Sequence, residues 1–128
     1  MEFITECLED YRYAKVTSDI ISSYGELAVK AQAISRLLIS LELYPSNMMV
    51  FVDGEANNNG IVKDILNIFN ENQKNGILER RRLQFIVQGD QVIPLVNKAD
   101  MLAYKIFYEL ERNRNYSIEG KEINIPVW

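Results

Sequence analysis

The sequence contains no histidine and a single cysteine, Cys7. Histidine is the usual general base near neutral pH and the commonest transition-metal ligand, so its absence excludes Ser-His-Asp catalysis, Cys-His catalysis and histidine zinc sites. One cysteine cannot form an internal disulfide, which agrees with a reducing compartment. Any catalysis must therefore use carboxylates, Lys, Tyr or Ser, and clustered carboxylates would favour a hard cation such as magnesium.

Long hydrophobic runs are also missing. No window approaches the roughly 18 consecutive apolar residues that a membrane span requires. Residues 1–6 lack the basic-then-apolar order of a signal peptide. We therefore expect a cytoplasmic, soluble protein with no membrane partner. The three prolines stand singly, and no linker or repeat interrupts the 128 residues, which indicates one α/β domain over residues 1–128.

The charge of the chain bears on its partners. Hydrophobic residues make up 48% and charged residues 25%, which is typical of a globular protein. The net charge of −4 repels nucleic acid, so such a partner would need a local basic patch or a bridging metal. The one dense basic run, residues 79–82, is typical of a solvated edge, and a phosphate contact is the alternative.

Apolar spacing predicts the main secondary-structure elements. Residues 25–43, residues from about 61 to 73, and a third segment ending near Arg112 each have a helical stripe. Continuous apolar runs at residues 48–52 and 83–87 predict strands covered on both faces. Residues 2–18 fit two short strands or one strand and a turn, although residues 6–11 also fit a helix.

This alternation of helices and buried strands predicts the fold class. We expect an α/β domain with a mostly parallel sheet, helices on both faces, and N-terminal antiparallel strands at or near the edge. The tail, residues 116–128, has strand-like apolar positions around a Glu119-Gly120 turn. It is predicted to form a hairpin, or an arm that docks on a partner.

Two aspartates are predicted at the carboxyl ends of strands, where open parallel sheets bind ligands. Asp53 follows the first buried strand, and Asp90 follows the second. Glu55 and the asparagines at residues 57–59 supply further oxygen ligands in the loop after Asp53. Ordinary turn chemistry explains the same residues, and it is the more common role for a residue such as Asp90.

Asp100 is the third candidate acid. It flanks the apolar stripe of the last helix, a position that is costly for a carboxylate unless a cation pairs with it. The alternative is a capping box in which Asn97 is the N-cap and Asp100 lies three residues further on. The two interpretations can coexist.

Two segments carry a resemblance to a known family. Residues 45–54 read PSNMMVFVDG, and residues 88–106 read QGDQVIPLVNKADMLAYKI. These segments resemble the ribonuclease H-like superfamily, most closely the domain of unknown function 3800 family. In that family a strand ending in Asp precedes a helix, another strand ends near an Asp, and a final helix opens with an A-D-x-x-A-like motif. Residues 99–103 match that motif, and the resemblance covers about residues 45–110.

The resemblance implies a chemistry. Asp53 and Asp100 would be catalytic metal ligands for magnesium or manganese, with Asp90 and Glu55 assisting, in phosphodiester cleavage of nucleic acid. The family's first strand carries an Asp-Glu-Ser-like motif that has no counterpart here, and Glu2, Glu6 or Asp10 would have to replace it.

Two functions therefore stay open. The first is a metal-dependent nuclease. The second is a degenerate, noncatalytic interaction module that forms a homodimer through its C-terminal arm and Trp128. A flavodoxin-like nucleotide binder is a weaker third alternative, because the sequence has no glycine-rich phosphate loop.

Overall fold

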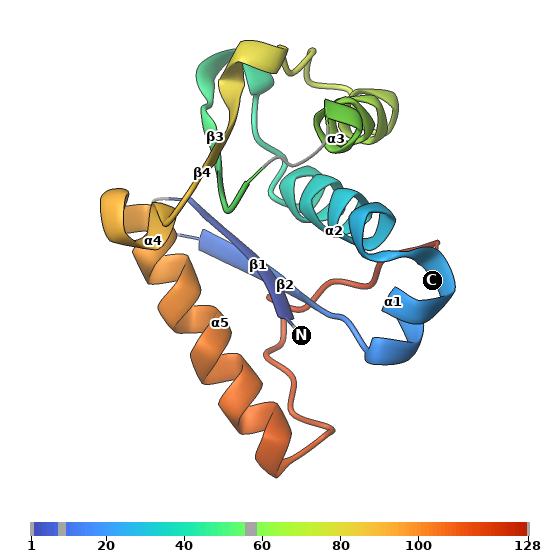
Figure 1. Ribbon diagram of the computed structural model, residues 1–128, viewed down its shortest axis with the longest axis vertical. Coiled ribbons are helices and arrows are strands. Elements are labelled where there is room, and N and C mark those ends of the chain that lie inside the picture. Colours follow the sequence, from blue (N-terminus) through green and yellow to red (C-terminus); the bar gives the residue numbers. More distant parts are fainter. Residues whose placement is uncertain (1, 8–9, 56–58, 128) are drawn as a thin grey trace.

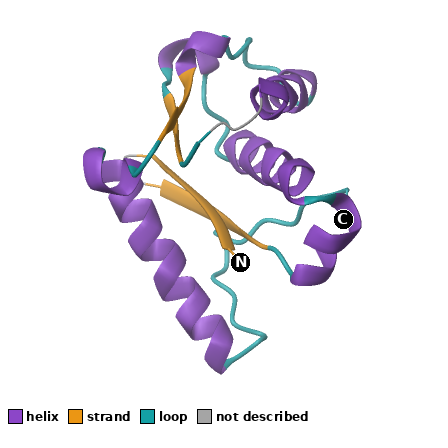
Figure 2. Ribbon diagram, viewed as in Figure 1, coloured by secondary structure: helices purple, strands orange, loops and turns teal. Residues whose placement is uncertain are grey.

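The computed structural model describes residues 2–7, 10–55 and 59–127, and the side chains from residue 10 onward except that of Asn59. Helices and strands alternate along most of the chain, which confirms a mixed α/β class (Figures 1 and 2). In order, the elements are β1 (Glu2–Cys7), β2 (Asp10–Lys15), α1 (Ser18–Tyr24), α2 (Glu26–Ser40), the 3₁₀ turn η1 (Pro45–Asn47), β3 (Val50–Asp53), α3 (Asn59–Glu71), the 3₁₀ turn η2 (Arg80–Arg82), β4 (Leu83–Ile86), α4 (Gly89–Val92) and α5 (Pro94–Arg112).

The strands form two pairs. β1 and β2 are antiparallel, with a register that runs from Glu2 opposite Lys15 to Cys7 opposite Asp10. The predicted antiparallel pairing is confirmed, but within the described residues the pair does not lie at the edge of the parallel sheet. β3 and β4 are parallel, with Val50 opposite Leu83 and Asp53 opposite Ile86. Within the described residues these pairs are separate two-stranded sheets, so the mostly parallel sheet of the prediction is reduced to the β3–β4 pair.

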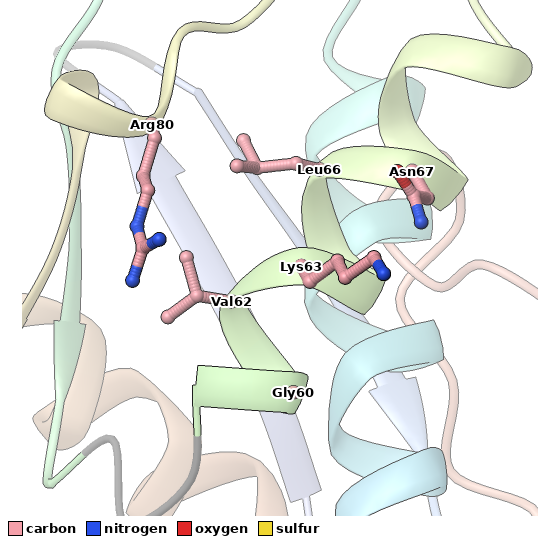
Figure 3. A pocket seen from close by; sticks show the side chains of 6 residues that line it. All are labelled: Gly60, Val62, Lys63, Leu66, Asn67 and Arg80. Atoms are coloured by element: carbon pink, nitrogen blue, oxygen red, sulfur yellow. The ribbon is translucent and has the colours of Figure 1, made fainter.

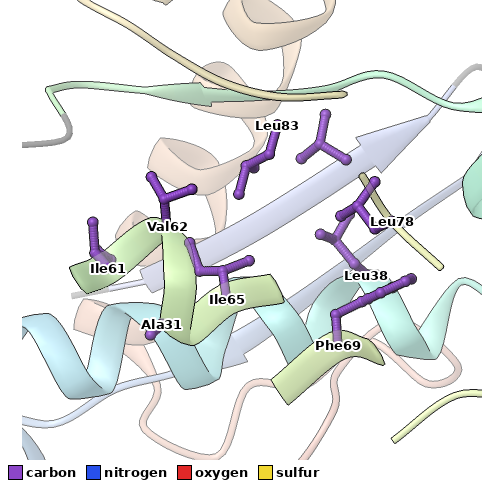
Figure 4. Close-up of a cluster of buried hydrophobic side chains, with 9 residues drawn as sticks. Ala31, Leu38, Ile61, Val62, Ile65, Phe69, Leu78 and Leu83 are labelled. Carbon is purple, nitrogen blue, oxygen red and sulfur yellow. The ribbon is translucent and has the colours of Figure 1, made fainter. Parts of the chain in front are cut away.

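Helices α2 and α3 cover one face of the β3–β4 pair. Alternation along each strand sends Val50 and Leu83 into the core, while Phe51 and Gln84 face outward. The prediction of helices on both faces therefore fails for this pair, whose second face is partly exposed. The core beneath the covered face contains nine buried apolar residues (Figure 4): Ala31, Leu38, Val50, Ile61, Val62, Ile65, Phe69, Leu78 and Leu83.

The hairpin lies between the two long helices. Both α2 and α5 contact β1, and Figure 1 shows them on opposite sides of the β1–β2 pair. Ser35, fully buried on α2, donates its hydroxyl to the Ala31 carbonyl oxygen at 2.7 Å and lies 3.2 Å from the Ile65 carbonyl oxygen of α3. A small polar side chain thus fits between the two helices without leaving its hydroxyl unsatisfied.

The tail docks on β2 of its own chain. The Tyr13 amide donates to the Lys121 carbonyl at 2.9 Å, and the Ile123 amide donates to the Tyr13 carbonyl at 2.9 Å. The buried Tyr13 hydroxyl donates to Glu122 Oε1 at 3.0 Å and accepts from the Ile118 amide at 2.9 Å. Ile125 is buried beside Ala14 and Leu37.

The predicted hairpin within the tail is therefore absent from residues 116–127, which contribute only one bridge to β2. The predicted docking on a partner through Trp128 lies outside the described residues. In the part of the chain that the structure describes, no helix is long and apolar enough to span a bilayer.

Asp10 links the hairpin to the tail by charge. Its Oδ1 lies 2.5 Å from Lys121 Nζ and 2.6 Å from an Arg12 guanidinium nitrogen. These hydrogen bonds, first from Lys121 and then from Arg12, hold the pKa of the Asp10 carboxyl well below its ordinary value. A carboxyl with a lowered folded-state pKa stabilises the fold above its unfolded-state pKa, and that contribution disappears as the pH falls through the folded-state pKa.

Asp10→Asn is therefore expected to lower the Tm at pH 6, where the carboxylate is charged in both states. The difference from the wild type should shrink below about pH 4, the ordinary aspartate pKa. Thermal melts by circular dichroism between pH 6 and pH 2 measure both effects, with the exposed Asp64→Asn as the control. A difference that stayed constant down to pH 2 would contradict this role for the Asp10 carboxylate.

Candidate functional site

The carboxyl ends of β3 and β4 meet at one edge, as the sequence predicted. Asp53 is the last residue of β3, and its Oδ1 accepts a hydrogen bond of 2.8 Å from the amide of Gly89, the first residue of α4. Gln88 adopts a left-handed conformation with φ 54°, which turns the chain sharply from β4 into α4. Asp90 follows Gly89 directly, so Asp53 and Asp90 belong to the same edge of the parallel pair.

Gly89 is the point where three elements approach each other. A Cβ atom at this position would lie 3.4 Å from Asp53 Oδ1 on β3 and 3.4 Å from Val96 Cγ1 on α5. Anything bulkier than a methyl group would have to push β3 and α5 apart. The glycine thus keeps the first turn of α5 against the end of β3.

Asp100 lies on α5, and within the described residues it forms no metal-binding group with Asp53 and Asp90. It lies four residues after Val96, which places it one helical turn further along the same side of the helix. Its side chain is exposed. The alternative capping role with Asn97 as N-cap is wrong, because α5 begins at Pro94 and Asn97 is already inside the helix, where its amide donates to the Ile93 carbonyl at 3.0 Å.

The remaining predicted acids are placed less favourably for binding a metal ion. Glu55 is exposed in the loop after Gly54, while residues 56–58, which include two of the predicted asparagine ligands, lie outside the described residues. Asp10, a candidate replacement for the missing first motif, already pairs with two cations. The side chains of Glu2 and Glu6 lie outside the described part of the chain. Among residues 2–7, 10–55 and 59–127, no group of three or more Asp, Glu, Cys or His side chains is arranged to hold a metal ion.

A second feature, a surface hollow between α3 and η2, was missed by sequence reasoning (Figure 3). Its volume is about 400 Å³. Two cationic side chains, one amide and two apolar side chains line it together with a glycine: Lys63, Arg80, Asn67, Val62, Leu66 and Gly60.

The three arginines of the basic run at residues 79–82 make different contacts. Arg81 pairs with Glu79 at 2.9 Å, and this hydrogen bond lowers the pKa of the Glu79 carboxyl. Arg82 donates to the Met48 carbonyl at 3.2 Å, which ties η2 to the segment before β3. Arg80 lines the hollow. The basic run was visible in the sequence, but Lys63 joins it only because α3 lies beside η2.

No known protein family, curated protein or solved structure matches this chain. The molecule is thus defined by its fold and its sites: a mixed α/β domain with an acidic edge at the end of a parallel strand pair and a basic hollow beside η2.

Proposed function

We propose that this chain is a ribonuclease H-like domain that cleaves phosphodiester bonds of nucleic acid with a divalent metal, at the edge formed by Asp53, Asp90 and Asp100. The supporting observation is the 2.8 Å hydrogen bond from the Gly89 amide to Asp53 Oδ1. This contact joins the two segments that resemble the domain of unknown function 3800 family, residues 45–54 and residues 88–106. The contact brings Asp53 of the first segment and Asp90 of the second to one edge of the molecule.

The type of donor at this edge suits a hard cation, and binding would have to draw the acids together, because the described ones form no group of three or more arranged to hold a metal. Carboxylate oxygens are the ligands that magnesium and manganese prefer, and no imidazole ligand competes in this histidine-free chain. Asp53, Asp90 and Asp100, with Glu55 from the adjacent loop, would hold the ion. A bound divalent ion supplies an activated water and stabilises the leaving oxygen in such cleavage.

The chain's own residues prepare that edge. The Gly89 amide fixes the orientation of the Asp53 carboxylate through one oxygen, and no hydrogen bond from the described residues holds the second oxygen. The edge is exposed, so a polymeric substrate can reach it. Without a cation these carboxylates repel a phosphodiester, and the net charge of −4 adds to that repulsion. Cleavage is therefore expected only with divalent metal.

The test compares the wild type with Asp53→Asn on labelled single-stranded, duplex and hybrid substrates in magnesium or manganese. Asparagine keeps an oxygen for the Gly89 amide, so the fold is retained while the metal-binding charge is lost. Cleavage by the variant is expected to fall to the metal-free background, and the control Asp64→Asn should cleave like the wild type. Equal cleavage by wild type and Asp53→Asn would end the proposal.

A noncatalytic, self-associating module is the second candidate, because α5 presents an exposed apolar stripe. Met101, Tyr104 and Tyr108 recur at spacings of three and four residues, and each is more than half exposed. The basic residues Lys98, Lys105 and Arg112 follow one side of the stripe together with one acid, Glu109. Asp100 and Glu111 follow the other side. Two parallel copies of α5 would place the basic side of one against the acidic side of the other.

This interface differs from the predicted C-terminal arm, because the described part of the tail is docked on its own β2. Sedimentation equilibrium tests the self-association. The wild type is expected to be a dimer and Tyr104→Glu a monomer. Tyr44→Glu, at a similarly exposed tyrosine outside α5, should remain a dimer. A monomeric wild type would exclude this candidate.

A further inference from the structure

The hollow between α3 and η2 combines positive charge with an apolar floor. Lys63 on α3 and Arg80 on η2 flank Val62 and Leu66 in Figure 3. An anion alone needs only the two cations, and an apolar ligand needs only the floor. Their combination suits a ligand that carries an anionic group next to a flat or apolar group.

The cations of the hollow are suited to phosphate. A guanidinium offers planar, paired donors that match phosphate oxygens, and an ammonium adds a mobile point charge. Both side chains are exposed, and the long Lys63 side chain can turn towards a bound anion. The chain as a whole is acidic, so Lys63 and Arg80 make the hollow a locally positive part of its surface.

The floor is fixed by the core. Val62 is buried and belongs to the main apolar cluster, and the partly buried Leu66 packs against that cluster one turn further along α3. The Asn67 amide beside them offers both a donor and an acceptor. A volume of about 400 Å³ lies within the range of small-molecule sites.

We infer that this hollow binds one nucleotide unit, with the phosphate held by Lys63 and Arg80 and the base lying on Val62 and Leu66. An unpaired base exposes its face and its edges, whereas a base inside a duplex exposes neither to such a hollow. The expected ligand is therefore a nucleotide of a single strand. A free mononucleotide carries the same phosphate and base, so it is the alternative ligand for this hollow. This binding site does not require that the acidic edge cleaves anything.

The experiment measures anisotropy of a fluorescein-labelled single-stranded oligonucleotide with EDTA present, so that no metal-dependent cleavage can occur. The double variant Lys63→Glu with Arg80→Glu is expected to bind at least about tenfold more weakly, which corresponds to about 1.4 kcal/mol. The control double variant, Lys74→Glu with Arg81→Glu, changes the net charge equally but leaves the hollow intact. Its affinity should stay close to that of the wild type.

Competition experiments distinguish a single strand from a free mononucleotide as the ligand. They also test whether the apolar floor of Val62 and Leu66 contributes to binding. A mononucleotide should displace the probe at lower concentration than inorganic phosphate does, and an unlabelled single strand should compete better than a duplex. Equal weakening by both double variants, equal competition by mononucleotide and phosphate, preference for duplex, or no binding by the wild type would each overturn the inference. Binding that persists in a wild type without nuclease activity would leave the inference standing while the proposed nuclease function fails.

Discussion

Replacing Phe69 with alanine is expected to lower the free energy of unfolding by about 3–5 kcal/mol, the usual cost of removing a large aromatic side chain from a packed core. Phe69 is 1% exposed and lies on α3 within the cluster that joins α2, α3 and the β3–β4 pair. Because domains of this size are stable by only about 5–15 kcal/mol, the variant should be close to unfolding at 37 °C. Urea denaturation followed by circular dichroism measures the change.

Phe51→Ala is the matched control for this prediction. Phe51 lies on β3 but faces outward and is 39% exposed, so its truncation leaves no enclosed cavity. We expect it to cost less than half as much as Phe69→Ala. Equal destabilisation by the two variants would mean that the outward face of the strand pair is covered in solution, and the assignment of the core to one face would be wrong.

A chain that ends at Asn115 is expected to lose about 3 kcal/mol or more of stability. The truncation removes Ile125 from its buried contact with Ala14 and Leu37, and loss of a buried aliphatic side chain alone costs about 2–5 kcal/mol. It also removes Glu122, the partner of the Tyr13 hydroxyl, and the two backbone hydrogen bonds to Tyr13. Tyr13 itself would change from fully buried to exposed.

Two point variants locate the effect within the tail. Ile125→Ala should reproduce a large part of the loss, while Val127→Ala, at an exposed position two residues later, should be nearly neutral. Denaturation midpoints measure all three changes, and sedimentation of the truncated chain should show the same oligomeric mass as the full chain. An unchanged midpoint after truncation would show that the tail does not belong to this core.

The helices and buried strands were largely predictable because their signal is local. The apolar stripes placed α2 and α3 within a few residues of their observed bounds, and the continuous apolar runs placed β3 and β4 equally well. Strand pairing depends on distant residues, so the division into two sheets was not predictable. The tail was ambiguous for the same reason: its isoleucines fit a hairpin, but Ile118 and Ile123 bond to Tyr13, and Ile125 packs on Ala14 and Leu37.

The candidate site was predictable to a similar extent. Asp53 and Asp90 were expected at strand ends, and the structure places both at the same edge. The N-cap assigned to Asn97 was wrong because Pro94 begins the helix nearly one turn earlier, and proline at the first helical position was the missed signal. The hollow combines Lys63 with Arg80, and only the packing of α3 beside η2 unites them.

The docked tail also sets an order of events during synthesis. Tyr13 and Glu122 are 109 residues apart along the chain, yet their side chains share a hydrogen bond. β2 leaves the ribosome long before the tail that covers it has been synthesised. During that time Tyr13 and Ala14 lack their contacts with Glu122 and Ile125. The nascent protein therefore exposes an incomplete hairpin until the segment with Glu122 and Ile125 has emerged, and chaperones can bind that surface during this interval.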